Sequence, residues 1–190
     1  MKTPIVDFVS RYADKDVSRF HMPGHKGASL LGCERLDITE IDGADVLYGA
    51  DGIIAESEEN ATALFGTAHT FYSTEGSTLA IKAMLATVSM QAQTRHGARP
   101  LILAARNVHR AFIHGCALLD LRVKWLYPKR AEHLCLCSLT ASDVELALTE
   151  GAERPAALYL TSPDYLGQTA DIKGIAEVCR KHGEIGRAHV

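Results

Sequence analysis

The stretch HTFYSTEGSTLAIKAML, residues 69–85, determines how the rest of the chain is interpreted. It begins with an aromatic and β-branched run at 70–72, continues with small polar residues at 73–78, and ends in an almost wholly apolar segment that reaches residue 88. This order predicts a strand end, a tight turn and a buried helix. α/β proteins build anion sites with this succession of elements, because the amides at the start of a helix are free.

Three residues of the turn have the chemistry that a phosphate site needs. Gly76 lets the backbone turn tightly, Ser77 can cap the helix, and the free amides together with the hydroxyls of Ser77 and Thr78 can hold a phosphate. The alternative is an ordinary turn between a strand and a helix, which also often carries a serine N-cap and a glycine.

Apolar and amphipathic segments alternate along the rest of the chain. Helices are expected at residues 4–18 and 54–65, on either side of a long ordered loop at 36–52. From there the pattern predicts strands at 68–72, 100–104, 121–126 and 156–161, and helices at 77–91, 107–118, 142–149 and 171–182. Strands that alternate with helices and are apolar enough to be buried on both faces predict an α/β fold with a doubly wound, mostly parallel sheet.

Capping residues support three of these helix boundaries. Asn107 is a natural N-cap, and Ser142 with Glu145 matches a capping box. Gly183 stands where the last helix is expected to end.

Charge and hydropathy exclude several classes of partner. The chain has 190 residues, 47% of them hydrophobic, and a net charge of −3, which is typical of an ordinary soluble chain with one substantial core. It has neither a basic face for nucleic acid nor a polybasic tail for a membrane surface. No apolar run approaches the ~20 residues that span a bilayer, and the N-terminus lacks the apolar centre of a signal peptide. We therefore expect no nucleic-acid partner and no membrane association.

The cysteines and histidines do not predict a metal site. The odd, scattered cysteine count contains no CxxC pair and is typical of reduced thiols in the cytoplasm (Cys33, Cys116, Cys135, Cys137, Cys179). His21 and His25 are four residues apart, but Pro23 and Gly24 between them exclude the helix that would place both on one metal. The simplest interpretation of FHMPGHKG (20–27) is a Gly/Pro turn with solvated His and Lys side chains, although this composition is unusual for a linker.

Three polar clusters follow predicted strand ends, at 73–78, 106–109 and 161–165. In a parallel sheet these ends lie at one edge, where ligands bind. A phosphate-binding turn, the imidazole of His109 and a Ser/Tyr cluster at that edge predict a phosphorylated, aromatic cofactor. Taken alone, His109 is more simply a polar residue in the first turn of a helix.

Five segments occur in the order expected for one enzyme family. They are FHMPGHKG (20–27), DITEIDGADVLYGADGIIAESEENATALFG (37–66), STEGSTLAIKAML (73–85), RNVHRAF (106–112) and TSPDYLGQTAD (161–171). In these segments the chain resembles the N-terminal part of the bacterial ornithine/lysine/arginine decarboxylases, from about residue 4 to 183. These are pyridoxal-phosphate (PLP) enzymes of the aspartate-aminotransferase fold, also called fold type I, and FHMPGHKG is the most specific of the five segments.

The resemblance implies a role for each of several residues. Gly76, Ser77 and Thr78 would hold the cofactor phosphate, His109 would stack on the pyridine ring, and Ser162 would lie near the phenolic oxygen of the ring. A further set would help form the active-site entrance or a subunit interface (His21, His25, Lys26). Two positions depart from the family pattern: Glu75 would bring a negative charge near the phosphate, and Asp164 stands where a threonine is common.

Residues 184–190, EIGRAHV, depart further from the family. The family continues with a hydrophobic strand that bears an Asp-x-Ala-His motif, whose aspartate pairs with the ring nitrogen, and the Schiff-base lysine comes later. Here no Asp precedes Ala188-His189 and no strand run leads into it. IGRAHV also corresponds to ATC-GGA-AGA-GCA-CAC-GTC, the start of a common sequencing-library adapter, so we expect a non-native tail. The alternative is a native polar tail on a degenerate paralogue.

The resemblance implies PLP-dependent decarboxylation of lysine, ornithine or arginine to the amine and CO2 by a cytoplasmic, homo-oligomeric full-length parent. The 190 residues alone are expected to be inactive, because the Schiff-base lysine is missing. The alternatives are an aminotransferase or another lyase of the same fold, and a non-catalytic paralogue that binds a partner. The expected organisation is an N-terminal helix and interface loop (1–52), a partial PLP-binding large domain (53–183) and the tail (184–190).

Overall fold

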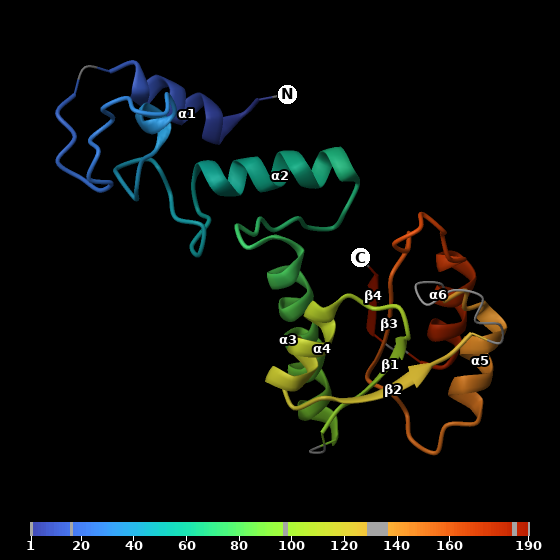
Figure 1. Ribbon diagram of the computed structural model, residues 1–190. Helices are drawn as coiled ribbons and strands as arrows, with labels where there is room; N and C mark the ends of the chain where they lie inside the picture. The colour runs from blue at the N-terminus through green and yellow to red at the C-terminus, as the bar shows by residue number, and fades with distance from the viewer. Residues whose placement is uncertain (1, 16, 97–98, 129–136, 184–185, 190) are drawn as a thin grey trace. The chain divides into compact units, whose positions relative to one another are not determined.

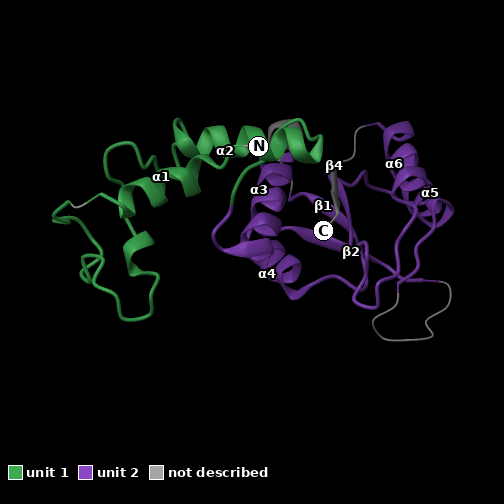
Figure 2. Cartoon of the chain, turned by 90° about the horizontal axis from the view of Figure 1, so that it is seen from above, with its two compact units in different colours: residues 1–72 green, residues 73–190 purple. Residues whose placement is uncertain are grey.

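The chain divides into two compact units, residues 1–72 and 73–190 (Figure 2). The computed structural model describes residues 2–15, 17–96, 99–128, 137–183 and 186–189. The boundary lies after Tyr72 rather than at the predicted 52/53. The reason is that α2 packs against α1, and the segment after α2 is bonded back to α2.

Among its described residues, the first unit contains two helices and one 3-10 turn, with long loops between them. The helices are α1 (Pro4–Ala13) and α2 (Ile53–Phe65), and the 3-10 turn is η1 (Glu34–Leu36). α1 is shorter than the predicted 4–18, because the amides of Asp14 and Lys15 close the helix on Ser10 and Tyr12. The expected loop at 36–52 is confirmed.

Two carboxylates fix the loops of this unit by accepting backbone amides. Glu34 accepts the amides of Leu30, Leu31 and Gly32 at 2.6–2.9 Å and is itself buried. Asp45 accepts the amides of four residues at 2.7–3.3 Å (Val46, Asp51, Gly52, Ile54). These bonds satisfy amides that have no helix or sheet to pair with.

The strand predicted at 68–72 is wrong. The amide of Tyr72 donates to Glu58 on α2 at 2.7 Å, and the Tyr72 hydroxyl bonds both the hydroxyl and the carbonyl of Ser57. Aromatic and β-branched residues favour a strand, but here side chains of α2 take the place of a neighbouring strand.

The second unit is an α/β domain with a four-stranded parallel sheet, as predicted. In sequence order it contains α3 (Gly76–His96), β1 (Leu101–Ala105), α4 (Arg110–Leu118), β2 (Arg122–Leu126), α5 (Ala141–Thr149), β3 (Ala157–Leu160), α6 (Ile172–Lys181) and β4 (Gly186–His189). The strand order is β2-β1-β3-β4, and every pairing is parallel. Helices α3 and α4 lie on one face of the sheet and α5 and α6 on the other, so the sheet is doubly wound (Figure 1).

Each face of the sheet has its own core, because side chains alternate along the buried strands. Ile102, Ala104 and Tyr159 pack against α3 and α4. Leu103, Leu158 and others pack against α5 and α6. On the first face Gly115 lets α4 approach α3 closely, since a Cβ at this position would meet Leu85 at 2.7 Å.

The predicted caps of two helices and the predicted C-terminal tail differ from the structure. α4 is capped by His109 instead of Asn107, and the capping box of α5 is formed by Thr140 and Asp143 instead of Ser142 and Glu145. The tail does contain a strand, since β4 pairs with β3 through Gly186–His189, which corrects the expectation that no strand leads to Ala188-His189. Gly183 does follow the end of α6, in the left-handed conformation (φ +78°).

Candidate functional site

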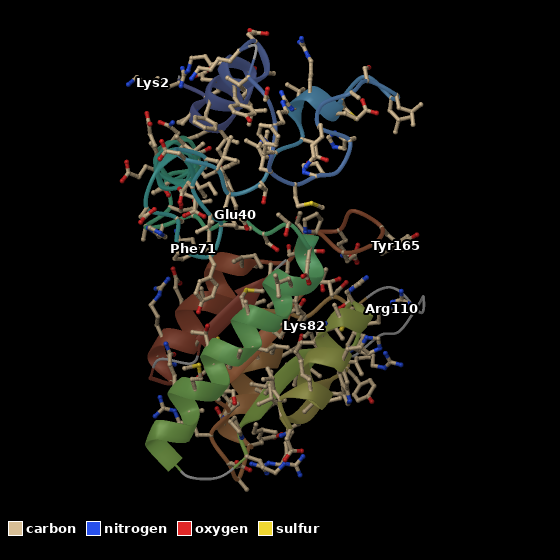
Figure 3. The ribbon with its side chains drawn as sticks, turned by 90° about the vertical axis from the view of Figure 1, so that its left-hand side faces the viewer. Lys2, Glu40, Phe71, Lys82, Arg110 and Tyr165 are labelled. Carbon is tan, nitrogen blue, oxygen red and sulfur yellow. The ribbon has the colours of Figure 1, made fainter. Side chains whose placement is uncertain are left out.

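Five of the predicted site residues belong to the second unit. They lie at the start of α3 and after β1 and β3, at the ends of these elements that meet at the carboxyl edge of the sheet. β1 and β3 are adjacent and parallel, so the segments after Ala105 and Leu160 leave the sheet at the same edge. α3 leads into the opposite end of β1, which places its first residues at the carboxyl edge as well. Figure 3 shows Tyr165 and Arg110 toward the same end of this unit as the start of α3. Fold topology thus brings Gly76–Thr78, His109 and Ser162 to one edge.

The start of α3 offers free donors. Gly76 begins the helix in the left-handed conformation (φ +63°), and a Cβ added there would meet no atom within 4 Å. Ser77 and Thr78 are exposed, and no hydrogen-bond partner is found for their hydroxyls among the described residues. A helix start with two exposed hydroxyls, and with open space around Gly76, has the donor set for a phosphate group.

His109 is fixed by its role as the N-cap of α4. Its Nδ1 accepts the amide of Ala111 at 3.1 Å, so the neutral ring carries its proton on Nε2. The imidazole is exposed. A ring held at one nitrogen by the backbone has a defined orientation and leaves its other face and Nε2 available to a ligand.

Ser162 is held in a similar way. Its Oγ accepts the amide of Ala170 at 3.0 Å, across the loop that follows β3. A hydroxyl that accepts one bond can still donate one, and therefore Ser162 can donate to an oxygen at this edge.

Two further polar atoms belong to the clusters that the sequence places at this edge, although no role was predicted for them. Asn107 Oδ1 and Thr161 Oγ1 are buried, and neither has a hydrogen-bond partner among the described residues. They follow the adjacent strands β1 and β3. Buried polar atoms without partners are uncommon, so this pair fits an edge that receives a polar ligand. The sequence signal was their place directly after two apolar strands.

The ionisable groups beneath this edge are kept neutral. Burial raises the pKa of the Cys116 thiol to about 11. Burial, reinforced by Cys116, raises the pKa of Tyr159 to about 12. Tyr159 stacks on Phe112, with ring centroids 4.4 Å apart. Both groups therefore belong to the core, and Cys116 is not a reactive thiolate.

The residues expected at an entrance or interface lie in the first unit, and their side chains form hydrogen bonds within its loops and to α1. His21 Nε2 lies 2.6 Å from the Tyr12 hydroxyl, and Lys26 Nζ donates to the carbonyl of His21. His25 Nδ1 accepts the amide of Gly27 at 3.0 Å, and its Nε2 pairs with Asp37 at 3.1 Å. FHMPGHKG is therefore a turn whose His and Lys side chains are held by hydrogen bonds, rather than a linker with free side chains. Its entrance or interface role stays a prediction.

A pocket of about 300 Å³ lies next to the carboxyl edge, between the segments that precede α5 and α6. Thr161 and Asp164, neighbours of Ser162, line it, but none of the five predicted cofactor-binding residues does. Its other walls include Ser138, Thr140 and Asp171, and the last two already cap their helices. The five residues predicted to bind the cofactor therefore lie outside the lining of this pocket.

Among the described residues, no helix combines the length and hydropathy that crossing a bilayer requires. The same residues contain no cluster of three or more His, Cys, Asp or Glu side chains suited to a metal ion. Four cysteines are free thiols, and Cys135 lies outside the described residues (Cys33, Cys116, Cys137, Cys179).

Comparison with known proteins identifies the family. The family described as Orn/Lys/Arg decarboxylase, major domain, matches residues 3–186. The chain belongs to the Orn/Lys/Arg decarboxylase family. An arginine decarboxylase from Halalkalibacterium halodurans is 31% identical over 189 residues, which are 94% of this chain. The chain spans 37% of the length of that relative, and 37% of an arginine decarboxylase from Bacillus subtilis.

Solved structures agree with the fold. A lysine decarboxylase from Francisella novicida superposes with a TM-score of 0.69 at 17% identity, over 86% of this chain and 25% of that one. A serine palmitoyltransferase from S. paucimobilis, solved with a bound PLP–myriocin aldimine, gives a TM-score of 0.50 at 17% identity, over 97% of this chain and 38% of that one. These likenesses show the fold: the chain has the α/β architecture of fold type I proteins.

Proposed function

We propose that the protein to which these 190 residues belong decarboxylates a basic amino acid, namely lysine, ornithine or arginine, to the corresponding amine and CO2 with PLP as cofactor. The observation that supports this best is the free start of α3 at the same edge as His109 and Ser162. Family membership supports the reaction class. We further propose cytoplasmic action as a homo-oligomer, dimer or larger.

Each of the five residues would contact a different part of the cofactor. The amides and hydroxyls of Ser77 and Thr78 would donate to the phosphate, and Gly76 would let it approach the helix start. His109 would cover one face of the pyridine ring. Ser162 would donate to the phenolic oxygen, because its hydroxyl proton is free while its oxygen accepts the Ala170 amide.

The role of these residues is to hold and orient. PLP supplies, when bound, an electron sink for the pair left on Cα as the carboxylate departs as CO2. His109 would restrict the orientation of the ring. The donors at the start of α3 would offset the phosphate charge.

The 190 residues by themselves are proposed to be catalytically inactive. None of their lysines matches the position of the family's Schiff-base lysine, and the aspartate that pairs with the ring nitrogen is likewise unmatched. The lysines are Lys2, Lys15, Lys26, Lys82, Lys124, Lys129, Lys173 and Lys181.

The test uses the full-length protein and measures CO2 and amine from lysine, ornithine and arginine. We expect release of CO2 in equal amount to the amine from one of the three substrates, and a loss of at least about tenfold in PLP affinity when Ser77 and Thr78 are both changed to Ala. Keto-acid formation without CO2 would favour an aminotransferase. Absence of any turnover, together with stable binding of a protein partner, would favour the non-catalytic paralogue.

A further inference from the structure

The loop after β3 is closed by a single residue, Asp164. Asp164 Oδ1 accepts the amides of Leu166 and Gln168, both at 2.9 Å. The backbone of Asp164 adds two bonds, one to the carbonyl of Gln168 at 2.8 Å and one from the amide of Gly167 at 2.9 Å. One aspartate thus closes a five-residue ring of backbone, 164–168, with four hydrogen bonds.

The hydrogen bond that holds Ser162 lies just outside this ring. Ala170 is two residues after Gln168, and its amide donates to Ser162 Oγ at 3.0 Å. Gln168 is anchored in addition by Ser138, whose hydroxyl donates to its side-chain oxygen at 3.2 Å. The place of the Ala170 amide therefore depends on the ring that Asp164 closes.

Tyr165 and Leu166, at the tip of the ring, are exposed, so packing does not hold the loop. Without the Asp164 carboxylate, the amides of Leu166 and Gln168 would have to turn to water. Ala170 would then be free to leave Ser162, and the serine hydroxyl would lose its fixed direction.

We propose that Asp164 is a positioning residue for the cofactor site: it closes the 164–168 ring, keeps the Ala170 amide on Ser162 Oγ, and thereby directs the Ser162 hydroxyl toward the phenolic oxygen of the cofactor. This inference rests on the proposed function. It gives a physical role to one of the two positions that depart from the family pattern. A threonine there has a shorter side chain with one hydroxyl and cannot supply the same charged acceptor.

The first readout needs no cofactor. Amide hydrogen exchange is measured by NMR on the 190-residue chain and on Asp164→Ala, Asp164→Asn and Ser162→Ala. We expect exchange at Ala170 to rise about tenfold in Ser162→Ala, which removes the acceptor of that amide, and to rise in Asp164→Ala as well, which removes the two side-chain bonds of the ring and so loosens the Ala170–Ser162 bond. Asp164→Asn keeps an acceptor oxygen and should stay close to the unchanged chain. Unchanged exchange at Ala170 in Asp164→Ala would overturn the inference.

The second readout isolates the phenolic oxygen. Pyridoxine 5'-phosphate keeps the ring, the phosphate and the phenolic oxygen but has no aldehyde to react with surface lysines, and its 3-O-methyl ether blocks that oxygen. Asp164→Ala and Ser162→Ala should each weaken the binding of pyridoxine 5'-phosphate about fivefold, and that of the ether by less than twofold. Equal losses for both compounds would show a general disturbance of the loop and overturn the inference.

Two controls complete the design. Glu177→Ala removes an exposed carboxylate from α6 of the same unit and should change neither readout. If Asp164→Ala does not fold, Asp164→Ser replaces it, because a serine hydroxyl can still accept one loop amide, and both effects are then expected at smaller size. If no form of the chain binds either compound, the proposed cofactor site is wrong, whereas the exchange at Ala170 still decides whether Asp164 positions Ser162.

Discussion

Among single residues, Glu75 is the one whose charge opposes the proposed phosphate site. It is exposed and directly precedes Gly76 at the start of α3. Two unit charges about 7 Å apart in water repel by roughly 0.6 kcal/mol, and the phosphate carries up to about two charges, so Glu75→Gln should bind pyridoxine 5'-phosphate about three- to sevenfold more tightly in low salt. Titration calorimetry checks this, and about 1 M salt should remove the gain. A weaker complex would contradict the assignment, since Glu75 would then itself be a contact.

Gly76 allows a second test at the residue scale, one that separates backbone strain from steric clash. Its φ of +63° costs a side-chain-bearing residue about 1 kcal/mol, although there is space for a Cβ. Gly76→Ala should therefore lower the free energy of unfolding by about that amount. Gly24 also has open space but no positive φ, so Gly24→Ala is the matched control. Equal effects of the two changes in urea unfolding would contradict the argument.

At the scale of elements, the capping box of α5 distinguishes two possible helix starts. Thr140 Oγ1 accepts the amide of Asp143 at 3.2 Å, and the Asp143 carboxylate accepts the amide of Thr140 at 3.0 Å. Thr140→Ala should cost about 1 kcal/mol of stability. Ser142, which the sequence pattern favoured, only bonds the Thr140 hydroxyl, so Ser142→Ala should cost clearly less. Urea unfolding of the two variants compares them, and the reverse order would move the helix start to 142.

The elements of the second unit were predictable because their periodicity agrees with their burial. Runs such as LILAA (101–105) are buried on both faces, and only a doubly covered parallel sheet accommodates them. The exact helix starts were not predictable, because several residues near each start are good caps. At α4 the N-cap is His109 and not Asn107, because the ring nitrogen of His109 accepts the Ala111 amide.

The same reasoning explains which parts of the site could be read from the sequence. Gly76, Ser77 and Thr78 follow from turn chemistry, and parallel strands place His109 and Ser162 at the same edge. The buried oxygens of Asn107 and Thr161 could not be foreseen, since burial of a single atom depends on packing that spans the sheet. The strand at 68–72 failed for a related reason: a distant carboxylate, Glu58, satisfies its backbone.

At the scale of the whole molecule, the two units are stabilised by different means. The second has an apolar core on each face of its sheet. The first exposes many of its large apolar side chains, with Phe20 93% and Leu30 88% exposed, and depends on carboxylates that bind loop amides.

Backbone bonds to Leu31 and its neighbours lower the pKa of Glu34 to about 2. Burial alone would raise the pKa of Asp45, but the amides of Val46, Ile54, Gly52 and Asp51 outweigh it and lower this pKa to about 2 as well.

These pKa values predict that acid unfolds the first unit before the second. Both folded values lie below the ordinary ones of 4.5 for Glu34 and 3.8 for Asp45, so the stability they contribute is complete above about pH 4.5 and is lost as the pH falls toward 2. In a pH titration followed by NMR, the amide peaks of 30–32 should move to unfolded positions in this window, while those of 102–104 stay folded. Glu34→Gln should already be less stable at pH 7, because a neutral amide oxygen is a weaker acceptor, and less sensitive to pH below 4.5. Simultaneous loss of both sets of peaks would mean that the two units unfold together. The first unit would then not be less stable in acid than the second.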